Sequence, residues 1–176
     1  MFKKQWPAIL LAFVAPIVLV FWWWGGFSHV EILQGEAGPY RIAYLLHEGD
    51  IGNALKTQKQ VFDALQQAGI KPGENVVVLL TDPRTSSKAE QRAKVGYILG
   101  LEDKLPPGLK EEIIPRRRVL MARVNAGILI APSKAYLALY DYLKPSGRDI
   151  RMPTVEIYRA GDSVARVGDL TVEMER

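Results

Sequence analysis

The distribution of hydrophobic and polar positions divides the chain into two unequal parts. From Trp6 to Trp24 no residue is charged, and the apolar stretch continues to Phe27. A helix over these roughly 22 residues would be about 33 Å long, enough to cross a hydrocarbon core of about 30 Å. Tryptophans stand at both ends, as in the interfacial belt of membrane helices: Trp6, Trp22, Trp23 and Trp24. The pattern predicts a short stub and a transmembrane helix over residues 1–27, with membrane contact through residues 6–27.

The charges that flank this stretch predict its orientation. Lys3 and Lys4 precede it, and the next lysine or arginine after it is Arg41. The positive-inside rule then places the N-terminus in the cytoplasm and the rest of the chain on the other side. We therefore expect a single-pass inner-membrane protein with a periplasmic C-terminal domain. The alternative is a cleaved signal peptide, but three tryptophans occupy the place of a small-x-small cleavage site.

The rest of the chain shows the periodicities of a folded α+β domain. We expect a linker at residues 28–38 and the domain at residues 39–176. Alternating and amphipathic patterns in its first half predict strand, helix, strand and strand at residues 40–48, 53–68, 75–81 and 91–99. The second half has the same order at residues 119–124, 132–143, 154–159 and 170–175.

The two halves match at a constant spacing, which indicates an internal repeat. Gly49 and Gly127, Val78 and Tyr158, and Asp82 and Asp162 all lie about 80 residues apart. Each unit has one helix to cover one face of its sheet, so the other face needs a second cover. We therefore predict a duplicated β-α-β-β unit with pseudo-two-fold symmetry, in which two sheets meet and leave a pocket at their junction.

Composition and charge exclude several kinds of chemistry. The chain has 176 residues, of which 48% are hydrophobic and 24% charged, so it suits one folded domain with an appendage. It has no cysteine, which removes disulfides, thiolate nucleophiles and thiolate metal ligands, and its two histidines do not suggest a histidine-rich metal site. A net charge of +4 does not by itself imply nucleic acid. We expect no metal, no cofactor and no nucleic-acid partner.

The repeat and its short motifs resemble a known family, the GyrI-like small-molecule-binding domain. This module is also the effector-binding domain of AraC- and MerR-type regulators. The resemblance covers residues 39–176 and is carried by the repeat order, by His47-Glu48-Gly49 after the first strand, by Thr81-Asp82-Pro83-Arg84 after the second, and by Val155-Glu156-Ile157-Tyr158. It implies an α+β domain that binds a small molecule in a central pocket between the two repeats.

Within this superfamily the chain is more similar to a membrane-anchored branch, which includes the animal testis-expressed ER-phagy receptor. The similarity rests on an N-terminal anchor placed directly before the domain and on the strand Gln91-Arg92-Ala93-Lys94-Val95-Gly96. The chain lacks that receptor's long tail, and it has an apolar stretch where the regulators have a DNA-binding domain. Neither a tail-borne autophagy motif nor transcription control is therefore implied.

Glu156 is the main candidate for a functional residue. In residues 154–159 the alternation places Glu156 and Tyr158 on one face of a strand, where the first unit has Val76 and Val78 at the same offset. The resemblance implies that Glu156 points into the central pocket, where it would face a cationic ligand or act as an acid/base. A carboxylate in an apolar cleft should have a raised pKa. The alternative is a solvated carboxylate on an edge strand.

Tyrosines are the second group of candidates, because aromatic faces attract organic cations. We assign Tyr158, Tyr44 and Tyr97 to the ligand site with Glu156. Tyr136 and Tyr140 fall at helical spacing with Leu139 and Leu143, which favours core packing.

Three other polar motifs are interpreted as structural. His47 and Glu48 are adjacent in a strand and point to opposite faces, so they do not form an acid/base pair. Arg116, Arg117 and Arg118 could bind an anionic headgroup, but a solvated basic turn is the preferred interpretation. Asp82 is expected to form a turn and to pair with Arg84 or Arg92.

Three functions are consistent with these residues. The first is a membrane-anchored module that binds a small amphipathic or cationic molecule through Glu156. The second is a hydrolase that uses Glu156 as an acid/base, aided by Tyr158. The third is a membrane-tethered adaptor for a protein partner, with no ligand. An enzyme needs a second polar group that converges on Glu156, and no serine, histidine or aspartate stands at a matching position. Ligand binding is therefore preferred.

Overall fold

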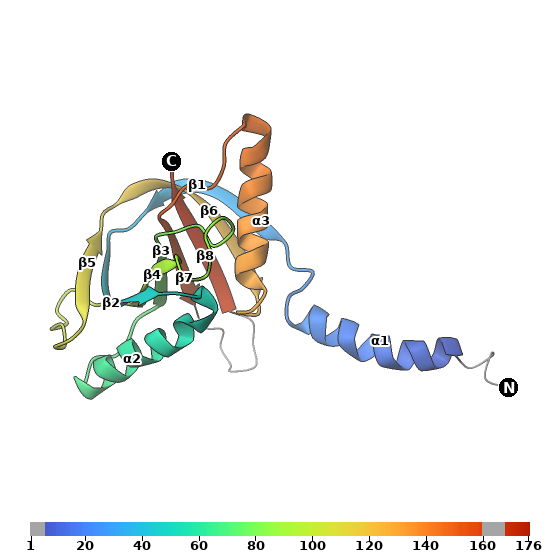
Figure 1. Ribbon diagram of the computed structural model, residues 1–176, viewed down its shortest axis with the longest axis horizontal. Helices are drawn as coiled ribbons and strands as arrows, with labels where there is room; N and C mark the ends of the chain where they lie inside the picture. The colour runs from blue at the N-terminus through green and yellow to red at the C-terminus, as the bar shows by residue number, and fades with distance from the viewer. Residues whose placement is uncertain (1–5, 160–167) are drawn as a thin grey trace.

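The computed structural model describes residues 6–159 and 168–176, without the side chains of residues 7–9. The elements in this part of the chain follow in the order drawn in Figure 1. They are α1 (Trp6–Trp23), β1 (Val30–Ala37), β2 (Tyr40–Glu48), a short 3-10 helix η2 (Ile51–Asn53), α2 (Ala54–Gln67), β3 (Asn75–Leu79), β4 (Arg92–Ile98), β5 (Lys110–Ile114), β6 (Arg117–Ala126), α3 (Ala131–Leu143), a second 3-10 helix η3 (Lys144–Ser146), β7 (Thr154–Arg159) and β8 (Gly168–Glu175).

The described strands form one antiparallel sheet of eight strands in the order β1-β6-β8-β7-β3-β4-β2-β5. The strand-helix-strand-strand order occurs twice, as β2-α2-β3-β4 and as β6-α3-β7-β8. From the centre of the sheet outward, the strands of one unit follow as β7-β8-β6 and those of the other as β3-β4-β2, so each strand has its repeat counterpart at the same distance from the centre. Two positive-φ glycines follow the helices of the two units, Gly69 at 72° and Gly147 at 67°.

The two units are joined edge to edge, which differs from the two facing sheets expected from the sequence. β3 and β7 pair with each other, so that Asn75 lies opposite Tyr158 and Val77 lies opposite Glu156. Backbone hydrogen bonding therefore makes the two units one continuous sheet. Pairing of this kind satisfies the backbone groups of two strands that would otherwise be exposed edges.

The edge strands are exchanged between the units. β1 comes before the first unit in sequence and pairs with β6 of the second. β5 lies between the units in sequence and pairs with β2 of the first. The stretch at residues 28–38 was expected to be a linker, but it contains β1 and contributes a full strand to the sheet.

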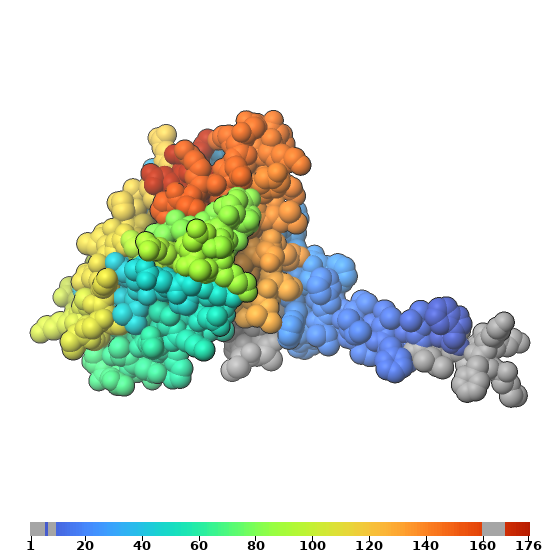
Figure 2. Space-filling view, in the orientation of Figure 1, coloured from blue at the N-terminus to red at the C-terminus, as the bar shows by residue number. Residues whose placement is uncertain are grey.

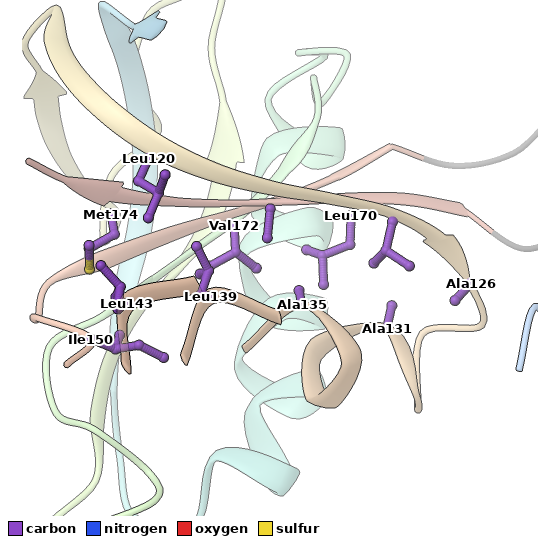
Figure 3. Close-up of a cluster of buried hydrophobic side chains, with 12 residues drawn as sticks. Leu120, Ala126, Ala131, Ala135, Leu139, Leu143, Ile150, Leu170, Val172 and Met174 are labelled. Carbon is purple, nitrogen blue, oxygen red and sulfur yellow. The ribbon is translucent and has the colours of Figure 1, made fainter. Parts of the chain in front are cut away.

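Both α2 and α3 cover the same face of the sheet. α2 packs on β2 and β4, and α3 packs on β6, β8 and β1. Between them, Ile51 and Ala54 from one unit and Tyr136 from the other pack on the same buried cluster in the centre of the sheet. Figure 3 shows the largest cluster, in which Ala135, Leu139 and Leu143 of α3 pack against residues of β6 and β8. Burial of this apolar face is the main source of stability for the layer.

The other face of the sheet is concave and buries a second apolar cluster, to which no helix of residues 6–159 and 168–176 contributes a side chain. Ile42, Val76, Val78 and Ile157 are buried there. The hydroxyl of Tyr40 on β2 donates to Glu173 Oε1 on β8 at 2.7 Å, although β4, β3 and β7 lie between these two strands in the sheet. The sheet must therefore curve strongly toward this face, and its own outer strands cover the cluster.

Gly38 allows the ends of the two exchanged strands to approach each other. It lies between β1 and β2 with a φ of 87°, and a Cβ atom there would be 2.9 Å from the carbonyl oxygen of Pro115, which lies between β5 and β6. A side chain would strain both the backbone conformation and this contact.

The expectation of an N-terminal transmembrane helix is wrong. α1 ends at Trp23 and has 18 residues, which is about 27 Å and shorter than the stretch to Phe27 that the sequence pattern suggested. The chain leaves the helical path at Gly25, which has a φ of 72°. In residues 6–159 and 168–176, no helix combines the length and the apolar character that crossing a membrane requires. The localisation deduced from it, a single-pass inner-membrane protein with a periplasmic domain, is likewise not supported. Figure 1 shows α1 projecting away from the sheet.

Two groups of sequence expectations lie outside the described residues. Lys3 and Lys4, from which the orientation was deduced, are among residues 1–5. Asp162, which was matched with Asp82 in the repeat, is among residues 160–167. The remaining repeat positions lie among the described residues, Val78 and Tyr158 in strands and Gly49, Asp82 and Gly127 in connections.

Candidate functional site

Glu156 lies near the centre of the sheet, on the face that α2 and α3 cover. It belongs to β7, and its cross-strand neighbours are Val77 on β3 and Val172 on β8. Only 5% of its surface is exposed. This excludes the alternative of a solvated carboxylate on an edge strand, because β7 has a partner strand on each side.

The two carboxylate oxygens of Glu156 accept hydrogen bonds from two phenols. Tyr136 on α3 donates to Oε1 at 2.9 Å, and Tyr158 on the same strand donates to Oε2 at 2.6 Å. The hydroxyls of Tyr136 and Thr154 are 2.7 Å apart, which extends the network along β7. No lysine, arginine or histidine of the described residues forms an ion pair with this carboxylate.

Burial dominates the electrostatics of this cluster. It raises the pKa of Glu156 above the ordinary 4.5, although both phenol hydrogen bonds act in the opposite direction. Burial, and the nearby Glu156, also raise the pKa of both phenols, that of Tyr136 well above 10. Both phenols therefore keep their protons and act as donors. The result is a buried acidic group whose ionised form is stabilised by hydroxyls and not by a cation.

Tyr136 is the residue of this cluster that sequence reasoning missed. Its helical spacing with Leu139 and Leu143 pointed to core packing, and the ring does pack on the central cluster. Its hydroxyl nevertheless reaches Glu156, which is 20 residues further along the chain. Helical periodicity identifies the face of the helix on which a residue lies, but not the strand residue opposite its polar tip.

The other proposed aromatic residues do not gather around Glu156. Tyr44 lies on the concave face with Ile42 and Val76, so the sheet itself separates it from Glu156. Tyr97 lies on the helix-covered face, in one row with Asn75 and Tyr158, but its hydroxyl accepts a hydrogen bond from Gln58 of α2 at 3.1 Å. Of the three tyrosines assigned to the site, only Tyr158 contacts Glu156.

The repeat offset of 80 residues matched the wrong residues of the two units. It equated Glu156 with Val76, which is buried in the concave cluster on the opposite face of the sheet. The neighbour of Glu156 in the sheet is Val77, and the neighbour of Tyr158 is Asn75. A difference of one residue exchanges the two faces of a strand, so spacing alone could not fix this relation.

The remaining polar motifs form structural contacts. Asp82 forms an ion pair with Arg84 at 2.6 Å, as expected. The ring of His47 lies 2.9 Å from the hydroxyl of Thr57 and 3.1 Å from the carbonyl oxygen of Asp50. The basic triplet is not simply a solvated turn, because Arg117 is largely buried and pairs with Glu173 at 2.9 Å on the concave face.

A cavity of about 290 Å³ lies at the C-terminal end of α3 and does not include Glu156. Its walls come from β1, β6, α3, the segment before β7 and the end of β8. At the central junction of the two units, the hydroxyls of Tyr136 and Tyr158 contact Glu156. No group of three or more metal-ligating side chains occurs among the described residues.

Comparisons with solved structures identify the fold. The C-terminal domain of EcmrR superposes with a TM-score of 0.63 at 12% identity, covering 83% of this chain and 96% of that one. An integron cassette protein from the mobile metagenome of Vibrio cholerae gives a TM-score of 0.53 at 7% identity, covering 84% and 97%. SAV2435 bound to tetraphenylphosphonium also gives 0.53, at 9% identity, covering 82% and 93%.

The chain has a GyrI-like fold. This agrees with the sequence resemblance at the level of the fold, whereas nothing in the comparisons supports the membrane-anchored branch. No protein-family model and no curated protein matches the sequence. Because the sequence identities to these solved structures are only 7–12%, the comparison shows the fold of the chain alone.

Proposed function

We propose that this GyrI-like domain binds a small organic cation with an apolar body, and that Glu156 is the counter-charge. The observation that carries the proposal is the buried carboxylate on the helix-covered face, which has two phenol donors and no cationic partner among the described residues. An ionised carboxylate in such surroundings is costly unless a positive charge compensates it. A ligand cation would supply that charge.

The surroundings of Glu156 favour an organic cation over a metal ion. Its neighbours are aromatic rings and aliphatic side chains, including Val77, Tyr136 and Tyr158. Aromatic faces attract cations whose charge is spread over an apolar body, whereas Ca²⁺ and Mg²⁺ require several oxygen ligands. The fold likeness is consistent with this, since SAV2435 has been solved with tetraphenylphosphonium.

In the absence of a ligand, the two phenols would serve as the hydrogen-bond donors to the carboxylate. Their hydroxyls occupy the positions at Oε1 and Oε2 from which a cation would be attracted. Tyr136 and Tyr158 are both only partly buried at the border of the cluster, and a ligand cation would displace at least one of their hydroxyls. Binding would then exchange a hydroxyl donor for a full positive charge.

Hydrolysis by Glu156 is less well supported by the same residues. An acid/base needs a polar group that acts with it on a substrate. The groups that contact Glu156 are phenols with raised pKa values, and both donate to it. This arrangement stabilises a negative charge and does not activate a nucleophile.

Calorimetry with tetraphenylphosphonium and its neutral relative triphenylphosphine oxide tests the proposal on the full chain. The wild type should bind the cation at a single site, and Glu156→Gln should weaken that binding at least about tenfold, because the substitution removes one desolvated charge pair. The neutral compound should bind both proteins alike. Glu175→Gln, which changes an exposed carboxylate on β8, is the matched control and should bind the cation like the wild type.

Equal affinity of the wild type and Glu156→Gln for tetraphenylphosphonium would refute the proposal. Thermal melting of each variant should accompany the titration, so that a loss of binding is not confused with a loss of folding. Glu156→Gln keeps the shape of the side chain, and a folded protein is expected.

A further inference from the structure

The cavity at the C-terminal end of α3 has an apolar floor. Leu143 of α3, Leu120 of β6, Met174 of β8 and Ile150 line it, and all four are at least nine-tenths buried. In Figure 3 these four side chains gather at one end of the core cluster. In Figures 1 and 2 the same end of α3 lies beside the C-terminal residues of the chain. The floor is therefore part of the buried core, at the end of α3 that lies near the end of β8.

Three guanidinium groups surround this floor. Arg148, Arg151 and Arg176 line the cavity, and the hydrogen bonds of their side chains go to neutral groups. Arg148 Nε donates to Ser146 Oγ at 3.0 Å, and Arg151 Nη2 donates to the carbonyl oxygen of Glu175 at 3.3 Å. Arg176 Nη1 donates to Gln34 Oε1 at 2.7 Å.

None of the three arginines has an ion-pair partner among residues 6–159 and 168–176. The acidic residue in the lining, Asp149, is directed elsewhere. Its Oδ1 accepts from Arg84 Nη2 at 3.0 Å and from the backbone N–H of Ile150 at 2.6 Å. These two bonds hold the pKa of Asp149 below its ordinary 3.8, so it is ionised. Asp149 shares Arg84 with Asp82, but the three arginines of the lining outnumber this one carboxylate. The cavity thus has an excess of positive charge.

Uncompensated guanidinium groups above an apolar floor are complementary to an amphipathic anion. A guanidinium presents N–H groups in a planar fork that matches a carboxylate, and the bond is stronger than one between neutral groups. A volume of about 290 Å³ is at the lower end of the range for ligand cavities, which limits the apolar body to a small one. We propose that this cavity binds a small carboxylate with an apolar body, such as a medium-chain fatty acid.

This site is distinct from the Glu156 cluster in charge and in position. The Glu156 cluster contacts α3 at Tyr136, and the cavity contacts it at Leu143. Seven residues along a helix correspond to about 10 Å. The anion site does not depend on the function proposed for Glu156, and the two can be tested separately in one protein.

Octanoate is a suitable probe, with acetate and octylammonium as matched comparisons. In calorimetric titrations of the full chain, octanoate should bind at one site. Acetate should bind much more weakly because it lacks the apolar body, and octylammonium should not compete because its charge is opposite. Arg148→Gln combined with Arg151→Gln should weaken octanoate binding at least about tenfold, since two charge-assisted contacts are lost.

Two control variants locate the effect. Arg123→Gln changes an exposed arginine of β6 outside the cavity lining and should bind octanoate like the wild type. Glu156→Gln should also bind octanoate like the wild type, which separates this proposal from the first one. With ¹³C-labelled methyl groups, octanoate should shift the NMR signals of Ile150 and Met174, which line the cavity, and not that of Ile157 on the concave face.

Three results would overturn the anion site. The first is equal octanoate affinity in the wild type and in the double arginine variant. The second is loss of octanoate binding in Glu156→Gln. The third is a dissociation constant for octanoate above about 10 mM, which is too weak for a specific site.

Discussion

Replacing Tyr158 by phenylalanine removes one of the two hydroxyl groups that donate to the buried Glu156, and leaves the aromatic ring in place. The bond is 2.6 Å long and ends on a carboxylate oxygen with no cationic partner among the described residues. A hydrogen bond to a charged group contributes about 1.5–3 kcal/mol to stability, and a bond between neutral groups about 0.5–1.5 kcal/mol. The loss should therefore be larger when residue 156 is an ionised glutamate than when it is glutamine.

A double-mutant cycle of Tyr158→Phe and Glu156→Gln isolates this difference. Urea unfolding of the four proteins at pH 8 should give a coupling free energy of about 1–1.5 kcal/mol between the two positions. At pH 4, where the carboxyl group is protonated in the folded chain, the coupling should fall below about 0.5 kcal/mol. The sign follows from the hydrogen bond of Tyr158, which lowers the pKa of Glu156 and therefore favours the ionised form.

Tyr97→Phe provides the matched control. The hydroxyl of Tyr97 also takes part in one hydrogen bond, which it accepts from Gln58. Strand β3 lies between Tyr97 and Tyr158 in the sheet, so the two residues are two strand spacings apart, about 10 Å. Its cycle with Glu156→Gln should show no coupling beyond about 0.5 kcal/mol. A coupling near zero for Tyr158 at pH 8 would show that its hydroxyl does not stabilise an ionised carboxylate.

Three further predictions concern the stability of the fold. Leu139 of α3 is fully buried, and Leu139→Ala should lower the free energy of unfolding by about 2–5 kcal/mol. Leu137 lies on the exposed face of the same helix, and Leu137→Ala should lower it by less than about 0.5 kcal/mol. Equal effects of the two substitutions in urea unfolding would mean that α3 is not packed as described. Arg117→Met leaves the buried Glu173 with only Tyr40 as a donor and should cost about 3 kcal/mol, whereas Arg118→Met, on the same strand but exposed, should be nearly neutral in the same assay. Burial raises the pKa of Glu156 in the folded chain above 4.5. The stability that Glu156 contributes is therefore fully present below about pH 4.5, and it is lost as the pH rises through the pKa of the folded state. The wild type should therefore lose stability relative to Glu156→Gln across that window, and parallel pH profiles of the two proteins would contradict the raised pKa.

The sequence predicted the interior elements of the sheet better than its edges. β3, α2 and α3 have the apolar periodicity of elements that face a core, and their ranges follow that periodicity closely. β1 and β5 were missed because an edge strand with one exposed side needs little apolar pattern, and β1 even carries Gly35 and two glutamates. Such strands are defined by the partner on which they pair, which local sequence does not reveal.

The candidate site could be predicted only in part, for a related reason. Alternation within β7 correctly placed Glu156 and Tyr158 on one face, and the resemblance drew attention to the pair. Tyr44 was assigned to the same site because periodicity gives the two faces of a strand but not which one faces the helices. Tyr136 and the buried pair of Arg117 with Glu173 depend on contacts between distant parts of the chain, for which the local pattern carries no signal.

Proton release on ligand binding is the most direct test of Glu156 as the counter-charge. The folded chain holds a proton on Glu156 more tightly than an exposed glutamate does, and a bound cation should lower that pKa again. Titration of tetraphenylphosphonium between pH 5 and 9, in buffers of different ionisation enthalpy, should show about one proton released per cation below the raised pKa, and an affinity that increases with pH. Glu156→Gln should release none and show a flat profile. A wild-type affinity that is independent of pH, or the same profile in the variant, would contradict the account.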